Sequence, residues 1–273
     1  MTGRTMTRAY VHGYDPRENC RLKDQANTLV DLLHGDTGYP AGSRVLEAGC
    51  GVGAQTVTLA RNSPGAHIVS VDISERSIAQ AEQSVKATGL SNVRFQQGDI
   101  FNLPFDPQSF DHVFVCFVLE HLKAPDVALR ALKEFVRPGG TLTVIEGDHG
   151  SAYFYPDSAA AQAAIHCQVD LQARAGGNAL IGRSLYPLLV AAGFQDVRVS
   201  PRMVYVDAGK PELADGFTKK TFAAMIKGVR EAAIAHGLIT PALFDKGIQD
   251  LVRTTEADGT FCYTFFKAFG TVV

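Results

Sequence analysis

The sequence predicts an α/β protein built on a doubly wound sheet of seven strands, mostly parallel, with the last strand antiparallel. Three observations favour this fold class. Apolar, β-branched runs alternate with helical patterns between residues 44 and 145, a glycine-rich turn follows the first apolar run, and no helix follows the aromatic run at 260–270. A strand with no crossover helix after it is expected to pair antiparallel with the preceding strand.

Local signals place the elements along the chain. Asp15 and Pro16 are typical of a helix N-cap and a first helical position, Ser74 of another N-cap, and Pro138-Gly139-Gly140 of a helix end. The expected helices span residues 16–33, 54–62, 74–89, 125–136 and 183–192. The expected strands span residues 45–48, 67–73, 93–97, 111–118, 141–145, 197–206 and 260–270.

The regular alternation divides the chain into two parts. Residues 1–42 are expected to form an N-terminal helical lid, and residues 43–273 the core. Two mostly helical insertions interrupt the core at about 150–182 and 208–257, and no strand is expected in the first of them.

Composition limits the classes of partner. The 273 residues carry a net charge of −2, so no basic excess is available for a nucleic-acid backbone. The start has no apolar signal region and no run reaches membrane-spanning length, so we expect no membrane partner. Five scattered cysteines without a C-x-x-C pair indicate neither a metal site nor a disulfide framework, and a cytoplasmic protein is expected. A small-molecule partner is favoured, and a homodimer is left open.

The stretch Glu47-Ala48-Gly49-Cys50-Gly51-Val52-Gly53 is the strongest chemical signal. Its three glycines permit positive φ and let a ligand approach bare backbone, while the helix that follows presents free N–H groups. The spacing departs from G-x-G-x-x-G, which disfavours a pyrophosphate dinucleotide. Asp72 ends the second strand about 20 residues later, where a doubly wound fold holds ribose hydroxyls.

Four motifs in order give the chain a family resemblance. They are residues 47–53, Asp72, Gly98-Asp99-Ile100, and the segment 116–122 followed by residues 137–140. With these motifs the chain resembles the class I S-adenosylmethionine-dependent methyltransferases, strongly over about residues 45–145, and this resemblance implies a Rossmann-like fold and S-adenosyl-L-methionine as cofactor.

The resemblance also implies roles for single residues. Glu47 would meet the ammonium group of the donor, Asp72 its ribose, and Asp99 its adenine amino group, with Ile100 and Phe101 packing on the ring. The full set expected at the donor is Tyr14, Glu47, Gly49, Gly51, Gly53, Asp72, Ile73, Asp99, Ile100, Phe117 and Leu119. Val118 is an alternative to Leu119, whereas Glu120 and His121 are as well explained by structural roles.

The acceptor side is predicted from polar and aromatic residues outside these motifs. Tyr10, His12 and Tyr14 precede the first helix and are expected to form a lid, with His12 as candidate base. Two further candidate bases are His149, which follows the fifth strand, and Asp170, which shares a helix face with His166. Aromatics favour an aromatic acceptor: Tyr153, Phe154, Tyr155, Tyr205, Phe261, Tyr263 and Phe265.

The predicted function is methyl transfer from S-adenosylmethionine to a small, aromatic or heteroaromatic acceptor, with methylation at carbon or nitrogen favoured. Orientation of the two reactants and exclusion of water would supply most of the catalysis. Three alternatives stay open: a methyltransferase for protein or RNA, a dehydrogenase, and a module that binds the donor without catalysis. No metal is expected, since no cluster of hard ligands stands out.

Overall fold

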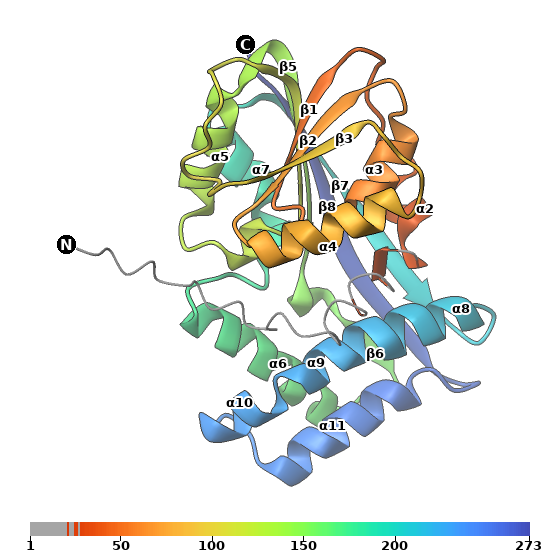
Figure 1. Ribbon diagram of the computed structural model, residues 1–273. Helices are drawn as coiled ribbons and strands as arrows, with labels where there is room; N and C mark the ends of the chain where they lie inside the picture. Colours follow the sequence, from red (N-terminus) through yellow and green to blue (C-terminus); the bar gives the residue numbers. More distant parts are fainter. Residues whose placement is uncertain (1–20, 22–24, 27) are drawn as a thin grey trace.

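The centre of the molecule is one eight-stranded sheet (Figure 1). The computed structural model describes residues 21, 25–26 and 28–273. Along the sheet the strands run in the order β3-β2-β1-β4-β5-β8-β6, and β7 also pairs with β8. The strands are β1 Arg44–Ala48, β2 His67–Asp72, β3 Val93–Gln97, β4 Phe110–Cys116, β5 Val136–Gly147, β6 Tyr153–Tyr155, β7 Gln195–Val206 and β8 Thr260–Thr271.

The first five strands are parallel and the last breaks the pattern. β1 pairs in parallel with β2 and β4, β2 with β3, and β4 with β5. β8 lies between β5 and β7 and is antiparallel to both, which confirms the predicted fold class and the predicted partner of the last strand.

The strand count differs from the prediction because β8 extends past the carboxyl end of its neighbour β5. The β5–β8 ladder ends at the pair Gly147 and Phe265, and β6 takes over the same edge of β8 at the pair Tyr153 and Cys262. The prediction that the first insertion contains no strand is therefore wrong. Pro138 also lies inside a strand, since β5 begins at Val136 after the preceding helix has ended at Glu134.

Helices cover both faces of the sheet. These helices are α2 Val30–His34, α3 Thr56–Asn62, α4 Glu75–Lys86, α5 Pro125–Glu134 and α7 Leu185–Ala191. Leu33 and Leu59 share a core cluster with Val45, whereas Leu129 packs in a second cluster with Leu46. Neighbouring residues of β1 thus face opposite layers, as a sheet buried on both faces requires.

The insertions build a helical layer across the carboxyl ends of the strands, seen below the sheet in Figure 1. It consists of α6 Ala159–Arg174, α8 Pro211–Leu213, a π-helix η4 Ala214–Ala223, α9 Ala224–Gly228, α10 Arg230–Ala235 and α11 Pro241–Arg253. Short 3₁₀ turns η1 Leu119–His121, η2 His149–Ser151 and η3 Ile181–Ser184 complete the connections. Phe217, Phe244 and Phe261 belong to the same core cluster as Val45, so the core continues from the sheet into this layer.

The predicted N-terminal helix lies only partly within the described residues. Ala26, Leu29 and Leu33 are buried, as the apolar pattern indicates, and Leu32 is half-buried against them. The predicted lid with Tyr14 and the candidate base His12 lies outside the described residues. Within the described ranges, no helix has the length and apolar character needed to cross a bilayer.

Candidate active site

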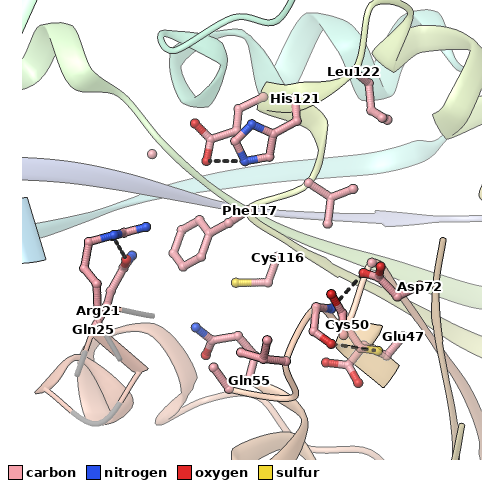
Figure 2. A pocket seen from close by; sticks show the side chains of 18 of the residues that line it. Arg21, Gln25, Glu47, Cys50, Gln55, Asp72, Cys116, Phe117, His121 and Leu122 are labelled. Atoms are coloured by element: carbon pink, nitrogen blue, oxygen red, sulfur yellow. Dashed lines mark hydrogen bonds and ion pairs between the residues drawn. The ribbon is translucent and has the colours of Figure 1, made fainter. Parts of the chain in front are cut away.

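A cavity of about 270 Å³ lies at the carboxyl ends of β1, β2, β4 and β5. Open α/β sheets place ligand sites at this edge, because parallel strands end there together. Figure 2 shows Glu47, Cys50 and Asp72 gathered in one part of the cavity, with Arg21 and Phe117 in another. The cavity therefore joins a wall made by the first strands to a wall made by β4, β8 and the insertions.

Each glycine of the turn after β1 has a positive φ, but for a different reason. Gly49, Gly51 and Gly53 have φ of 79°, 52° and 78°. A Cβ on Gly49 would collide with Val118, and one on Gly53 would lie 2.9 Å from the Cα of Ala81. A Cβ on Gly51 would meet no protein atom within 4 Å, and this residue lines the cavity.

Gly51 is thus the glycine whose bare backbone faces a ligand site. Gly49 also lines the cavity, whereas Gly53 lies outside its wall and serves the packing of the turn against α4. The expected contact of Gly53 with the donor stays a prediction.

Glu47 is a buried carboxyl group in the cavity wall. Its Oε2 accepts hydrogen bonds from Thr56 Oγ1 at 2.8 Å and Ser70 Oγ at 2.5 Å. No described residue donates to Oε1. Burial raises the pKa of Glu47 from 4.5 to about 7, although the two hydroxyls oppose the change. A cation in the cavity would favour the ionised form, so the expected contact with an ammonium group stays a prediction.

Asp72 ties the turn after β1 to the end of β2. Its Oδ2 accepts from the backbone N–H of Gly51 and its Oδ1 from that of Ser74, both at 2.9 Å. Burial raises the pKa of Asp72 against the effect of these bonds. Ser74 caps α4 by accepting from Ser77, as predicted, and Ile73 lines the cavity with 49% of its surface exposed. Asp72 is therefore already oriented at the site predicted for ribose hydroxyls.

An Asp72→Ala variant is expected to weaken donor binding by about 1.5–3 kcal/mol, the scale of hydrogen bonds to a charged group. The loss combines the contact to the donor with the release of the Gly51 and Ser74 amides that Asp72 holds. Calorimetry with S-adenosylhomocysteine measures it, and Asp106→Ala, at an exposed carboxylate, is the matched control. Equal affinities for the Asp72→Ala variant and wild type would remove Asp72 from the donor site.

Asp99 and Ile100 line the cavity beyond β3, as the resemblance implies. Asp99 Oδ1 accepts from the backbone N–H of Phe101 at 3.1 Å, so this carboxylate also holds its own turn. Phe101 packs against the second core cluster and is not part of the cavity wall, so its expected packing on a bound ring is corrected.

The segment after β4 reaches the cavity through a strained residue. Phe117 has a φ of 57°, a conformation that is rare for bulky side chains and costs about 1–3 kcal/mol. Its ring lines the cavity, and so does Val118. Buried Glu146 holds the turn, because its Oε1 accepts from the backbone N–H groups of Val118 and Leu119 at 3.0 and 2.7 Å.

Leu119 does not reach the cavity. Its side chain is fully buried in the second core cluster, because the 3₁₀ turn at Leu119–His121 directs it under α5. The expected donor contact of Leu119 is therefore corrected in favour of the alternative, Val118.

The π-helix η4 supplies an aromatic wall that the sequence did not reveal. Phe217, Thr221 and Phe222 all line the cavity. In an α-helix, residues five apart point about 140° away from each other at 100° per residue. The wider i→i+5 turn of a π-helix brings Phe217 and Phe222 onto one face, with ring centroids 6.4 Å apart.

Of the aromatics expected at the acceptor that the structure describes, two line the cavity. Tyr263 and Phe265, on β8, do so, and their rings contact Phe222 and Phe217 with centroids 5.3 and 5.9 Å apart. The other expected aromatics lie elsewhere: Tyr153, Tyr155 and Tyr205 are exposed, and Phe154 and Phe261 are buried in the core.

Polar side chains meet at the aromatic end of the cavity. His149 Nδ1 and Tyr263 OH are 2.6 Å apart, and His149 Nε2 lies 4.0 Å from Glu120 Oε2. Gln172 Nε2 donates to the same Glu120 oxygen at 3.0 Å, and His121 Nε2 lies 3.7 Å from Glu120 Oε1. Burial lowers the pKa of His149 and keeps its ring neutral.

The candidate bases separate clearly. His149 lines the cavity, whereas Asp170 and its neighbour His166 are exposed on α6 and take no part in the cavity wall. Asp170 and His166 do share a helix face, but this face is directed to solvent, so Asp170 is discarded as a base. Among the described residues, no group of three His, Cys, Asp or Glu side chains is arranged to hold a metal ion.

The doubly wound sheet with its antiparallel last strand, and a cavity over the glycine turn, define a class I methyltransferase fold. A family model described as "Methyltransferase domain" matches residues 40–193. The chain therefore belongs to the methyltransferase-domain family, whose methyl donor is S-adenosyl-L-methionine.

The relatives of the chain include one uncharacterized protein and one named methyltransferase. An uncharacterized 37.1 kDa protein in transposon TN4556 of Streptomyces fradiae is 33% identical over 231 residues, 84% of this chain and 66% of the relative. Demethylmenaquinone methyltransferase of Staphylococcus aureus is 30% identical over 134 residues, 49% of this chain and 55% of the relative. The matches thus span about half to two thirds of these relatives.

Solved structures share the fold. Phosphoethanolamine N-methyltransferase 2 of Haemonchus contortus, in complex with S-adenosylhomocysteine, superposes with a TM-score of 0.56 at 16% identity, over 91% of this chain and 53% of that chain. At this identity the likeness concerns the fold alone.

The cavity residues fit the donor of the family. Gly51 leaves open space where a Cβ would stand, as close approach of a ligand requires. Glu47 offers a carboxylate oxygen without a described partner, a group suited to an ammonium ion. Asp72 and Asp99 add carboxylates that accept hydroxyl and amino protons, while Ile73 offers an apolar surface.

Proposed function

We propose that the protein transfers a methyl group from S-adenosylmethionine to a small aromatic or heteroaromatic acceptor, at carbon or nitrogen. One observation supports this above all: the cavity that carries Glu47, Gly51 and Asp72 continues into a wall of Phe117, Phe217, Phe222, Tyr263 and Phe265. Such a wall suits a flat apolar body, since aromatic rings pack on one another at these centroid distances. The relative named demethylmenaquinone methyltransferase agrees with a small-molecule acceptor.

The residues of the cavity would act mainly by orientation. When bound, the donor supplies a methyl group activated by its sulfonium charge. Glu47, Asp72 and Asp99 hold one reactant, and Phe117 and the η4 wall position the other and exclude water. Holding two reactants in the reacting geometry contributes up to about 7–11 kcal/mol. Of the two candidate bases that the structure describes, His149 lies in the cavity wall and Asp170 does not.

A screen tests the proposal. The purified chain is incubated with S-adenosylmethionine carrying a labelled methyl group and a library of aromatic and heteroaromatic compounds, and products are read by mass spectrometry. We expect label in at least one small compound, with the position assigned by NMR. Label in RNA or protein only would favour the macromolecular alternative, and donor binding without any labelled product would favour a binding module.

A further inference from the structure

We propose that Glu120 and His149 together bind a protic group of the acceptor, an O–H or an N–H, with Glu120 as the proton acceptor and His149 as a hydrogen-bond donor. This inference rests on the proposed function and adds the chemical group by which the acceptor is recognised. It also assigns the base to Glu120, a residue for which the sequence left a structural and a functional role equally open.

The distance between the two side chains carries the argument. His149 Nε2 and Glu120 Oε2 are 4.0 Å apart, too far for a hydrogen bond but close enough for one oxygen or nitrogen atom to reach both at ordinary length. Nε2 is buried and has no hydrogen-bond partner among the described residues, while the side chain is only 7% exposed and lines the cavity. A buried polar atom aimed into a cavity is expected to meet a ligand.

The ring of His149 is fixed in orientation. Tyr263 OH lies 2.6 Å from Nδ1, and the imidazole packs edge-on against Phe222 with centroids 6.3 Å apart. Burial raises the pKa of Tyr263 well above its ordinary value, so the phenol keeps its proton, and the backbone of Asp148 also hydrogen-bonds to it. In the proposed arrangement the phenol O–H donates to Nδ1, and the neutral imidazole carries its proton on Nε2.

The carboxylate of Glu120 is oriented from the opposite side. Gln172 Nε2 donates to Glu120 Oε2 and to the Glu120 backbone oxygen, each at 3.0 Å. Gln168 Nε2 in turn donates to Gln172 Oε1 at 3.0 Å, and both glutamines are buried. A carboxylate oxygen accepts more than one hydrogen bond, so Oε2 has capacity for a proton of the acceptor beside that of Gln172.

These two partners suit a group that both accepts and donates. An acceptor O–H or N–H would take the Nε2–H of His149 on a lone pair and give its own proton to Glu120. In the reaction the acceptor atom, or a ring carbon conjugated to it, forms the bond to the methyl carbon. The electron pair of the methyl–sulfur bond stays on sulfur, and the proton of the acceptor moves to the Glu120 carboxylate.

Fragment binding tests the pair without turnover. Phenol and aniline carry an O–H and an N–H, and benzene has the same ring without either. Affinities are measured by NMR titration, with and without S-adenosylhomocysteine, in wild type, Glu120→Gln and His149→Phe. Glu134→Gln and His166→Asn, at exposed residues on α5 and α6, are the matched controls.

We expect Glu120→Gln and His149→Phe to weaken the binding of phenol or aniline at least about tenfold. The affinity for benzene should stay within about twofold of wild type. Which of the two probes responds identifies the protic group. Equal losses for benzene, or no loss for either protic probe, would overturn the proposal.

Wild type alone provides a second test, because nitrogen-15 correlation spectra report the tautomer of His149 directly. A proton on Nδ1 would also overturn the proposal. Calorimetry with S-adenosylhomocysteine separates this outcome from a failure of the proposed function, which would show as absent donor binding.

Discussion

A Gly51→Val variant is expected to keep the fold and to lose affinity for the methyl donor by about a hundredfold or more, at least about 2.7 kcal/mol. A Cβ at this position would meet no protein atom within 4 Å, so the valine would not collide with the chain. It would instead fill cavity space beside the amide that donates to Asp72. Calorimetry with S-adenosylhomocysteine measures the loss, and circular dichroism checks the fold.

The control must separate occupied space from backbone strain. Gly51 has a φ of 52°, which a β-branched residue adopts at a cost of about 1–3 kcal/mol. Gly89 has a φ of 74°, likewise meets nothing within 4 Å, and lies at the end of α4 outside the cavity wall. Gly89→Val should therefore lower stability by a similar amount with unchanged donor affinity. Wild-type affinity in Gly51→Val would mean that no ligand approaches this turn.

Glu47 is expected to make stability fall as the pH rises from below 4.5 to above 7. The folded chain holds the proton of this buried carboxyl up to a pKa of about 7, whereas the unfolded chain releases it near 4.5. The stabilising contribution is therefore complete below 4.5 and is lost as the pH passes 7. At about 1.4 kcal/mol per pH unit, the free energy of unfolding changes by about 3 kcal/mol over this interval.

The Glu47→Gln variant isolates this contribution from those of other titrating groups. The amide oxygen still accepts from Thr56 and Ser70, but nothing titrates. Urea unfolding across the pH range measures the free energy of unfolding. Between the acidic and alkaline ends, that of the variant should rise by about 3 kcal/mol relative to wild type. Glu134→Gln, at an exposed glutamate, controls for the loss of one carboxylate. A constant difference between Glu47→Gln and wild type would contradict the assignment.

The Glu47 carboxyl group should also make the affinity for the methyl donor depend on pH. If the ionised carboxylate binds an ammonium group, wild-type affinity rises as the pH increases towards 7, by up to about tenfold per pH unit. Glu47→Gln should bind more weakly by about 1.5–3 kcal/mol at alkaline pH and lose this slope. Calorimetry in buffers of different ionisation enthalpy would report the protons released on binding.

Local patterns were sufficient for the core of the fold and for one side of the site. The cap at Ser74, the glycine turn and the carboxyl ends of β1 and β3 each depend on a few neighbouring residues, and they lie where the sequence indicates. Carboxylates at strand ends were found for the same reason, since Glu47 and Asp72 follow from strand positions. Their burial, which sets their pKa values, follows only from the packed structure.

The other side of the site depends on non-local packing. β6 exists only because β8 extends beyond β5, which no pattern in Tyr153–Tyr155 shows. On α6 the polar residues mislead: Gln168 and Gln172 are buried, whereas His166 and Asp170 of the same helix face solvent. A polar periodicity therefore could not tell which face of this helix is buried in the protein.

The π-helix also bears on how the acceptor pocket can change between this protein and its relatives. An i→i+5 turn is an α-helical turn with one residue added, and here the π-helix Ala214–Ala223 contains both Phe217 and Phe222. In a relative without it, the two aromatic positions would stand four apart and still face together on a regular helix. Such a chain would keep both rings while losing one wall position, the kind that Thr221 occupies here. The gain or loss of a single codon, with no substitution of an aromatic, is thus a short evolutionary step between acceptor pockets of different outline.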